Sequence, residues 1–253
     1  MKPLAARLLC VLAAVAAVAV ATAADERRSG RDTMSPALQA LQADDGQHPA
    51  QLALAQGLEL WTAGARSCAS CHGEPARQMG GVAARYPAWD AGQRRLLDLP
   101  LRIQSCRVRH QGLPAWAPEA EPLLALSALV AQQSRGQPLA PPRGPELDAA
   151  AARGAALYNT RLGALNLACA HCHDQRAGQR LGGSLIPQAQ VDDYPVYRLE
   201  WQALGSLQRR LRGCVSGVRA QAWDWDSEEL LALEVFLARR SAGLTMQPPG
   251  VRP

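Results

Sequence analysis

Two pentapeptides of one pattern, CASCH at 68–72 and CAHCH at 169–173, constrain this chain more than any other feature of its sequence. Each has two cysteines three positions apart and a histidine directly after the second cysteine. In this C-x-x-C-H pattern the thiols form thioether bonds to the vinyl groups of a c-type haem, and the histidine binds the iron. The sequence therefore predicts two covalently bound haems. The attachment thiols and the axial histidines are Cys68, Cys71, His72, Cys169, Cys172 and His173.

A redox C-x-x-C site or a structural zinc site would also use paired cysteines. Zinc would need two more ligands at matching spacing, and a zinc ribbon gives no reason for a histidine directly after both pairs. Disulfides are a further use of cysteines in an exported chain. The histidine that follows both pairs favours haem attachment over these alternatives.

The N-terminus has the form of an export signal. Lys2 and Arg7 form a short basic region. A run of mostly apolar residues follows, LLCVLAAVAAVAVATAA, which contains the small residues Ala21-Thr22-Ala23. A retained membrane anchor is the alternative, but the run is short for a spanning helix and its small-residue exit is typical of a cleavage site. We expect residues 1–24 to be removed, which leaves a soluble periplasmic protein without a membrane anchor. Loss of these residues lowers the formal net charge from +5 to about +3, too weak to indicate a nucleic-acid partner.

The two motifs lie in two copies of one sequence unit. In each copy a glycine precedes an aromatic residue by four positions, and a Tyr-Pro pair lies 20 residues before a further cysteine, Cys106 or Cys214. Other pairs match at an offset of 108 residues: Trp89 and Tyr197, Leu96 and Leu204, Leu99 and Leu207, Arg102 and Arg210, Ile103 and Leu211. Repetition of this kind indicates duplicated structural units, so Cys106 and Cys214 are equivalent positions.

Helical periodicity predicts an all-α fold of two tandem class I cytochrome c-like domains. Leucines after Pro122 and again after Asp226 are spaced as on one helix face, and Asp226 with Glu229 predicts a helix start. A helix over the segment that precedes Cys214 is expected to end near Gly213. The Pro/Gly-rich stretch 134–148 is typical of a linker. We expect an N-terminal domain at 25–140 with the first haem and a C-terminal domain at 145–253 with the second haem and the active site.

Each iron needs a second axial ligand, and the duplicated candidates are Cys106 and Cys214. The other methionines and histidines beyond residue 24 do not occupy matching positions in the two copies. They are Met34, Met79, Met246, His48, His110 and His171. His110 competes most directly because it lies four residues after Cys106, whereas His171 is expected to face solvent. A thiolate stabilises ferric iron and lowers its reduction potential. The alternative is a disulfide between Cys106 and Cys214, although equivalent residues in two copies more simply have equivalent local roles.

Arginines surround the second of these cysteines in RRLRGCVSG, residues 209–217. Arg210 lies one helical turn before Cys214, while Arg209 and Arg212 add charge nearby. A solvated helix surface is the alternative interpretation of such a cluster. Beside a thiolate bound to haem, guanidinium groups would bind an oxyanion through paired hydrogen bonds. The second copy therefore has the better chemistry for an active site.

Together, the two C-x-x-C-H motifs, the equivalent distal cysteines and the stretch RRLRGCVSG resemble the SoxA family of periplasmic thiosulfate oxidation, over essentially the whole mature chain. The resemblance implies an L-cysteine S-thiosulfotransferase that joins thiosulfate oxidatively to a cysteine of the carrier SoxYZ. It implies a heterodimer with a small monohaem cytochrome, SoxX. It also implies that Cys106 and Cys214 are axial ligands, that Cys214 is the catalytic residue carried as a persulfide, and that Arg210 binds substrate.

Two other functions stay open on the sequence. A thiosulfate dehydrogenase that couples two thiosulfates to tetrathionate also has two haems and a cysteine ligand. A non-catalytic dihaem electron carrier would use Cys214 only as a ligand.

Overall fold

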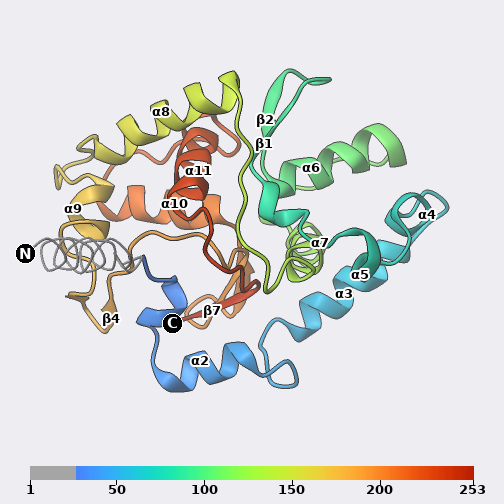
Figure 1. The fold of residues 1–253 in the computed structure, drawn as a ribbon, viewed down its shortest axis with the longest axis horizontal. Helices are drawn as coiled ribbons and strands as arrows, with labels where there is room; N and C mark the ends of the chain where they lie inside the picture. Colours follow the sequence, from blue (N-terminus) through green and yellow to red (C-terminus); the bar gives the residue numbers. More distant parts are fainter. Residues whose placement is uncertain (1–26) are drawn as a thin grey trace, which may run out of the picture.

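The computed structural model describes residues 27–253, so the predicted signal peptide lies outside the described residues. Within them, the chain forms two similar sets of helices that lie beside each other (Figure 1). The helices of the first copy are α3 (Gln51–Thr62), α4 (Cys68–His72), α5 (Pro75–Gln78), α6 (Leu99–Cys106) and α7 (Glu121–Gln132). Those of the second copy are α8 (Pro145–Asn159), α9 (Cys169–His173), α10 (Leu207–Gly217) and α11 (Glu228–Arg240). A further helix, α2 (Pro36–Ala43), precedes both copies.

Short strands join the helices, so the predicted all-α class is confirmed only in part. After its Tyr-Pro pair each copy turns back on itself in a hairpin before the helix that carries the third cysteine. The antiparallel hairpins are β1 (Ala88–Asp90) with β2 (Arg95–Leu97) and β5 (Val196–Arg198) with β6 (Ala203–Gly205). Strand β7 (Gly250–Arg252) adds to β5 in parallel, and β3 (Arg180–Leu181) pairs with β4 (Ser184–Leu185).

In each copy the first and last long helices cross at a glycine. Helix α3 packs on α7, and α8 packs on α11. A Cβ atom at Gly57 would collide with the backbone carbonyl of Ala125, and one at Gly154 would collide with the carbonyl of Ala232. The repeated glycines of the sequence therefore mark the positions where two helix backbones approach closely.

The hairpins pack reciprocally across the two copies. Leu204 of β6 joins a buried cluster with Leu54 and Leu124 of the first copy. Leu96 of β2 joins the corresponding cluster with residues of α8 and α11. Since each hairpin fills part of the hydrophobic core of the other copy, the copies share one continuous interior.

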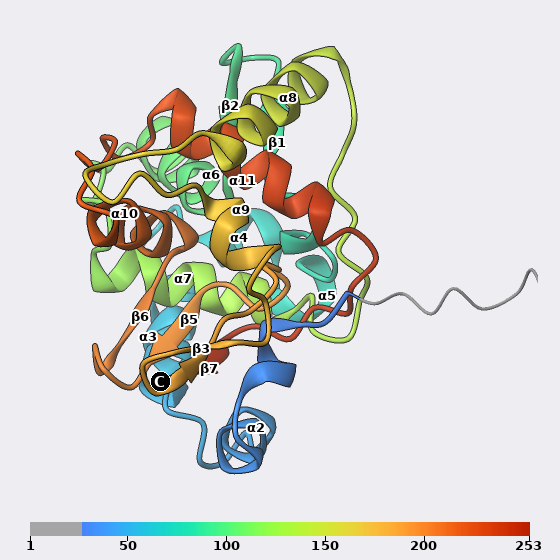
Figure 2. The same ribbon diagram turned by 90° about the vertical axis from the view of Figure 1, so that its left-hand side faces the viewer.

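The N-terminal segment packs against the C-terminal strand, and Figure 2 shows α2 and the C-terminus on the same side of the molecule. The side-chain amide oxygen of Gln42 accepts from the backbone nitrogen of Val251 at 3.0 Å. His48 is buried, and its Nε2 donates to the carbonyl oxygen of Pro249 at 3.0 Å. The stretch predicted as a linker is also held: the backbone nitrogen of Leu139 donates to the carbonyl of Leu244 at 2.9 Å.

Two predicted helix ends are wrong by a few residues. Helix α10 continues through Cys214 to Gly217, because glycine at 213 does not interrupt an otherwise helical stretch. Helix α11 is capped by Ser227, whose hydroxyl accepts from the nitrogen of Leu230, and not by Asp226. Asp226 has a φ of +59°, which places it outside the helix.

Candidate haem cavities

A first cavity lies between α3, α4, α6 and α7. Its volume is about 340 Å³, and most of its lining is apolar. Cys68 and His72 reach it from α4, and Cys106 reaches it from the opposite helix α6. Trp61 closes one side and donates its indole N–H to the carbonyl oxygen of Gly73 at 2.8 Å, which anchors the end of the C-x-x-C-H turn.

A second cavity occupies the equivalent place in the second copy. His173 of α9 and Cys214 of α10 both line it, together with Arg210, Leu211 and Leu237. Tyr158 takes the place of Trp61 and donates to the Asp174 carboxylate at 2.9 Å, again directly after the C-x-x-C-H turn. The structure thus brings together the two pairs that the sequence repeat aligns, His72 with Cys106 and His173 with Cys214.

His173 and Cys214 face each other within hydrogen-bonding reach across the second cavity. The Nδ1 of His173 lies 2.7 Å from the carbonyl oxygen of Pro187, an acceptor that fixes the proton on Nδ1. This contact turns Nε2 toward Cys214 in the cavity, the usual orientation of an axial histidine.

The residues of both cavities fit a c-type haem. A histidine and a thiol approach one interior from opposite helices, as the two axial ligands of one iron must, and the walls are largely apolar. Of the four attachment cysteines, Cys68 itself lines its cavity, whereas Cys71, Cys169 and Cys172 lie outside the two linings. All six cysteines of residues 27–253 are free, and Cys106 and Cys214 lie in different cavities, which argues against the alternative disulfide.

The two equivalent thiols have opposite electrostatic surroundings. Burial raises the pKa of Cys106; the charge of Arg102 acts in the opposite direction, and the nearby Cys71 and Asp90 raise the pKa as burial does. Burial would also raise the pKa of Cys214, but the hydrogen bond from His173 and the charges of Arg210 and Arg198 outweigh it. The pKa of Cys214 is therefore lowered, so this thiol favours the thiolate form.

The competing histidines line neither cavity, whereas one methionine lines each. His110 is exposed and does not line the first cavity. His171 is half-buried, so the prediction that it faces solvent is wrong. Its Nδ1 accepts from the backbone nitrogen of Ala168 at 2.9 Å and caps α9. Met79 lines the first cavity and Met34 lines the second, but the two methionines do not occupy matching positions in the copies.

Of the clustered arginines, only Arg210 faces the second cavity. The guanidinium of Arg209 stacks on Trp201 at 3.9 Å, and that of Arg212 stacks on Trp225 at 4.5 Å. A different arginine, Arg198 of β5, takes their expected place in the lining. The sequence reasoning missed Arg198, although the 108-residue offset aligns it with Asp90 and so carried the signal.

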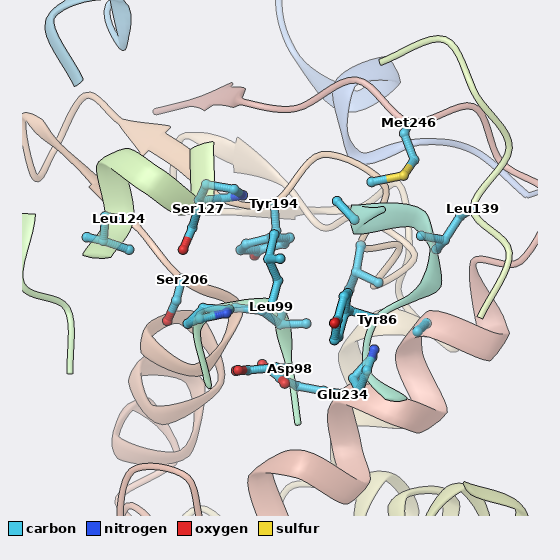
Figure 3. A pocket seen from close by; sticks show the side chains of 17 residues that line it. Tyr86, Asp98, Leu99, Leu124, Ser127, Leu139, Tyr194, Ser206, Glu234 and Met246 are labelled. Atoms are coloured by element: carbon cyan, nitrogen blue, oxygen red, sulfur yellow. The ribbon is translucent and has the colours of Figure 1, made fainter. Parts of the chain in front are cut away.

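A third cavity lies where the two copies meet, and Figure 3 shows its lining. Equivalent residues of both copies line it, including Tyr86 with Tyr194. At one side the carboxyl groups of Asp98 and Glu234 lie next to each other. Both are buried, and one oxygen of Glu234 has no hydrogen-bond partner in the described structure. Burial raises the pKa of Asp98 to about 6. Burial, together with repulsion from Asp98, raises the pKa of Glu234 well above its usual value.

We expect this pair to make the protein less stable as pH rises. Because both pKa values are raised, the folded chain binds more protons than the unfolded chain, so stability falls from about pH 4 upward through pH 6. In Glu234→Gln the amide keeps a donor for Asp98 and cannot ionise. Its melting temperature should therefore change less between pH 5 and pH 8 than that of the unmodified protein. Glu228→Gln, an exposed change on the same helix, is the control, and an equal pH dependence in both variants would contradict the prediction.

Comparison with known proteins agrees with this geometry. The family model described as SoxA/TsdA, cytochrome c domain, matches residues 56–139 and 153–246, one match in each copy. The chain belongs to the SoxA/TsdA cytochrome c family. The double match confirms the predicted tandem arrangement of cytochrome c domains.

Members of this family with assigned names align over most of the chain. This chain is 37% identical over 216 residues to the L-cysteine S-thiosulfotransferase subunit SoxA of Pseudaminobacter salicylatoxidans. The alignment covers 83% of this chain and 76% of that protein. The chain is 31% identical over 220 residues to the SoxA subunit of Paracoccus pantotrophus, with 84% and 74% covered. The crystal structure of SoxXA from P. pantotrophus superposes with a TM-score of 0.85 and 29% identity, covering 90% of this chain and 87% of that one.

None of the helices formed by residues 27–253 is long and apolar enough to cross a bilayer.

Proposed function

We propose that this chain is a dihaem L-cysteine S-thiosulfotransferase subunit of the periplasm, which attaches thiosulfate oxidatively to a cysteine of a carrier protein. The observation that carries the proposal is the second cavity, where a thiol with a lowered pKa lies between a histidine and cationic arginines. The names of the SoxA relatives give the reaction class.

In this proposal the two copies hold one haem each, within domains at 25–140 and 145–253. The attachment thiols are Cys68 and Cys71 in the first copy and Cys169 and Cys172 in the second. The axial pairs are His72 with Cys106 and His173 with Cys214. The facing positions of these side chains across each cavity support the assignment. When bound, the second haem supplies an acceptor for electrons beside Cys214.

The reaction forms a bond between the outer sulfur of thiosulfate and the carrier thiol. A carrier cysteine and one thiosulfate give a cysteine S-thiosulfonate, one proton and two electrons, so the transfer is an oxidation. Arg210 binds the anion, since a guanidinium matches the oxygens of a sulfonate with paired N–H donors. Cys214 is the site where substrate sulfur attaches, supported by its place beside Arg210 in the same cavity.

The proposed partners follow from the same relatives. The structure that superposes on the chain is of SoxXA, so we assign a SoxX-like monohaem cytochrome as the heterodimeric partner that takes the electrons onward. The carrier is of the SoxYZ type and presents its cysteine on a mobile arm.

Product analysis with the purified heterodimer tests the function. With thiosulfate, the carrier and an electron acceptor, the carrier should gain the mass of a thiosulfonate group, and tetrathionate should not accumulate. Free tetrathionate without any carrier would instead identify a thiosulfate dehydrogenase. Electron transfer with neither product would identify a non-catalytic carrier. Intact-mass spectrometry of the resting protein adds a second criterion, an extra sulfur on the chain that is lost on reduction.

Replacement of Arg210 by alanine should weaken substrate use without removing haem. The lost guanidinium contributes on the order of 1.5–3 kcal/mol of charge-assisted hydrogen bonding, which corresponds to about a 10- to 100-fold fall in kcat/KM for thiosulfate. Steady-state assays and the haem absorbance of the purified variant measure the two quantities. Unchanged kcat/KM at normal haem content would contradict the assignment of Arg210.

A further inference from the structure

The two copies differ in the sign of the charge at one equivalent position near the distal cysteines. Asp90 is the last residue of β1 and pairs with Arg95 across its hairpin. Arg198 is the last residue of β5 and pairs with Ala203 in the same register. The two positions are therefore equivalent in the fold, but one is an anion and the other a cation.

In the first copy the carboxylate at this position forms an ion pair. Asp90 accepts from the Nη1 of Arg102 at 2.7 Å, and Arg102 is the equivalent of Arg210. The backbone nitrogen of Gln93 also donates to Asp90, at 2.8 Å, which fixes the carboxylate. Arg102, one helical turn before Cys106, is thus already neutralised by the protein.

In the second copy the same two positions are both arginines. Arg198 and Arg210 line one cavity with Cys214, and the side chain of Arg198 is only 13% exposed. Within residues 27–253 no carboxylate pairs with Arg210. The third arginine of this cavity, Arg252, is already paired with Asp193.

Arg198 is held in place through one edge of its guanidinium. Its Nε donates to a carboxylate oxygen of Pro253, the last described residue, at 3.1 Å, and forms an ion pair at 3.5 Å with Glu200, which is more than half exposed. In the described part of the chain its Nη atoms make no hydrogen bond. Arg198 and Arg210 repel each other across this cavity, so an anion held between them would relieve that repulsion.

We infer that Arg198 is a second anion-binding arginine, which holds the sulfonate end of thiosulfate jointly with Arg210. We further infer that the Asp90/Arg198 difference restricts the anion to the second copy. Two guanidinium groups provide more donors than one for the three oxygens of a sulfonate, and their fixed planes orient the outer sulfur relative to Cys214. This inference rests on the proposed function and adds a specificity-determining residue to it.

Equilibrium binding of thiosulfate to the haem-loaded heterodimer tests the inference independently of turnover. Calorimetric titration should give a Kd about 10- to 100-fold higher for Arg198→Gln than for the unmodified protein. Arg198→Asp should weaken binding further, because its carboxylate would pair with Arg210 as Asp90 pairs with Arg102. Arg209→Gln removes the same charge one residue from Arg210 but outside the cavity lining, and should leave the Kd within about twofold.

Each outcome of this experiment supports or overturns the inference. A Kd unchanged in Arg198→Gln, at normal haem content and normal transfer by the unmodified protein, would overturn it. An altered haem spectrum with an unchanged Kd would instead assign Arg198 to a haem propionate, which also overturns it. If the unmodified heterodimer neither binds thiosulfate nor loads the carrier, the proposed function itself fails.

Discussion

Replacing Cys214 with serine is expected to lower the rate of thiosulfate transfer by on the order of 10³-fold or more. Serine keeps the size of the side chain but removes the sulfur to which substrate attaches. The hydroxyl also remains protonated, whereas the pKa of the Cys214 thiol is lowered by His173 and by Arg210 and Arg198. Single-turnover assays with a carrier protein measure the effect on transfer itself, apart from later electron transfer to the partner.

The duplication supplies a matched control. Cys106→Ser removes the equivalent thiol from the first cavity, where Asp90 neutralises Arg102. This variant should retain transfer activity to within about tenfold. Electron paramagnetic resonance of the oxidised proteins should show one changed ligand set in each variant, that of the second haem for Cys214→Ser and that of the first for Cys106→Ser. Transfer retained by Cys214→Ser would rule out this thiol as the site of attachment.

Replacing Gly154 with alanine is expected to lower the free energy of unfolding by about 1–3 kcal/mol. The added Cβ would overlap the backbone carbonyl of Ala232 in α11, so one helix must shift against the other. Alanine normally favours a helix over glycine by nearly 1 kcal/mol, so a loss of stability here isolates the cost of the collision. Denaturant unfolding followed by circular dichroism at constant haem content measures it.

A second glycine gives the control for this change. At Gly217, in the last turn of α10, an added Cβ would have no described atom within 4 Å. Gly217→Ala should leave stability unchanged or raise it slightly. If Gly154→Ala were as stable as Gly217→Ala, the close crossing of α8 and α11 would not be a required feature of the fold.

The two copies share one arrangement of helices and hairpins but carry different charges beside the distal cysteine. The glycine crossings, the hairpins and the positions of the distal cysteines repeat in both copies. The residue that ends the first hairpin strand does not, since it is Asp90 in one copy and Arg198 in the other. The arginine one turn before the distal cysteine is therefore paired with a carboxylate in the first copy and lies beside a second arginine in the second copy.

Much of the site could be predicted from the sequence because its signals are local or repeated. The spacing within each C-x-x-C-H motif and the shared offset of Cys106 and Cys214 predict which residues gather around each cavity, and the structure brings them together. Their binding of haem stays a prediction. The tandem domains could be predicted because each unit repeats a helical periodicity. The family model, which matches once in each copy, confirms them.

Only the tertiary structure decided what lies between the copies and which arginine faces the anion. The contacts of Leu96 with α8 and α11, and of Leu204 with α3 and α7, join residues far apart in the chain, and no local pattern specifies them. Among Arg209, Arg210 and Arg212, orientation depends on how α10 is rotated against its neighbours. Sequence determines composition and periodicity over a few residues, whereas the direction of a side chain depends on packing between elements that meet only in the folded chain.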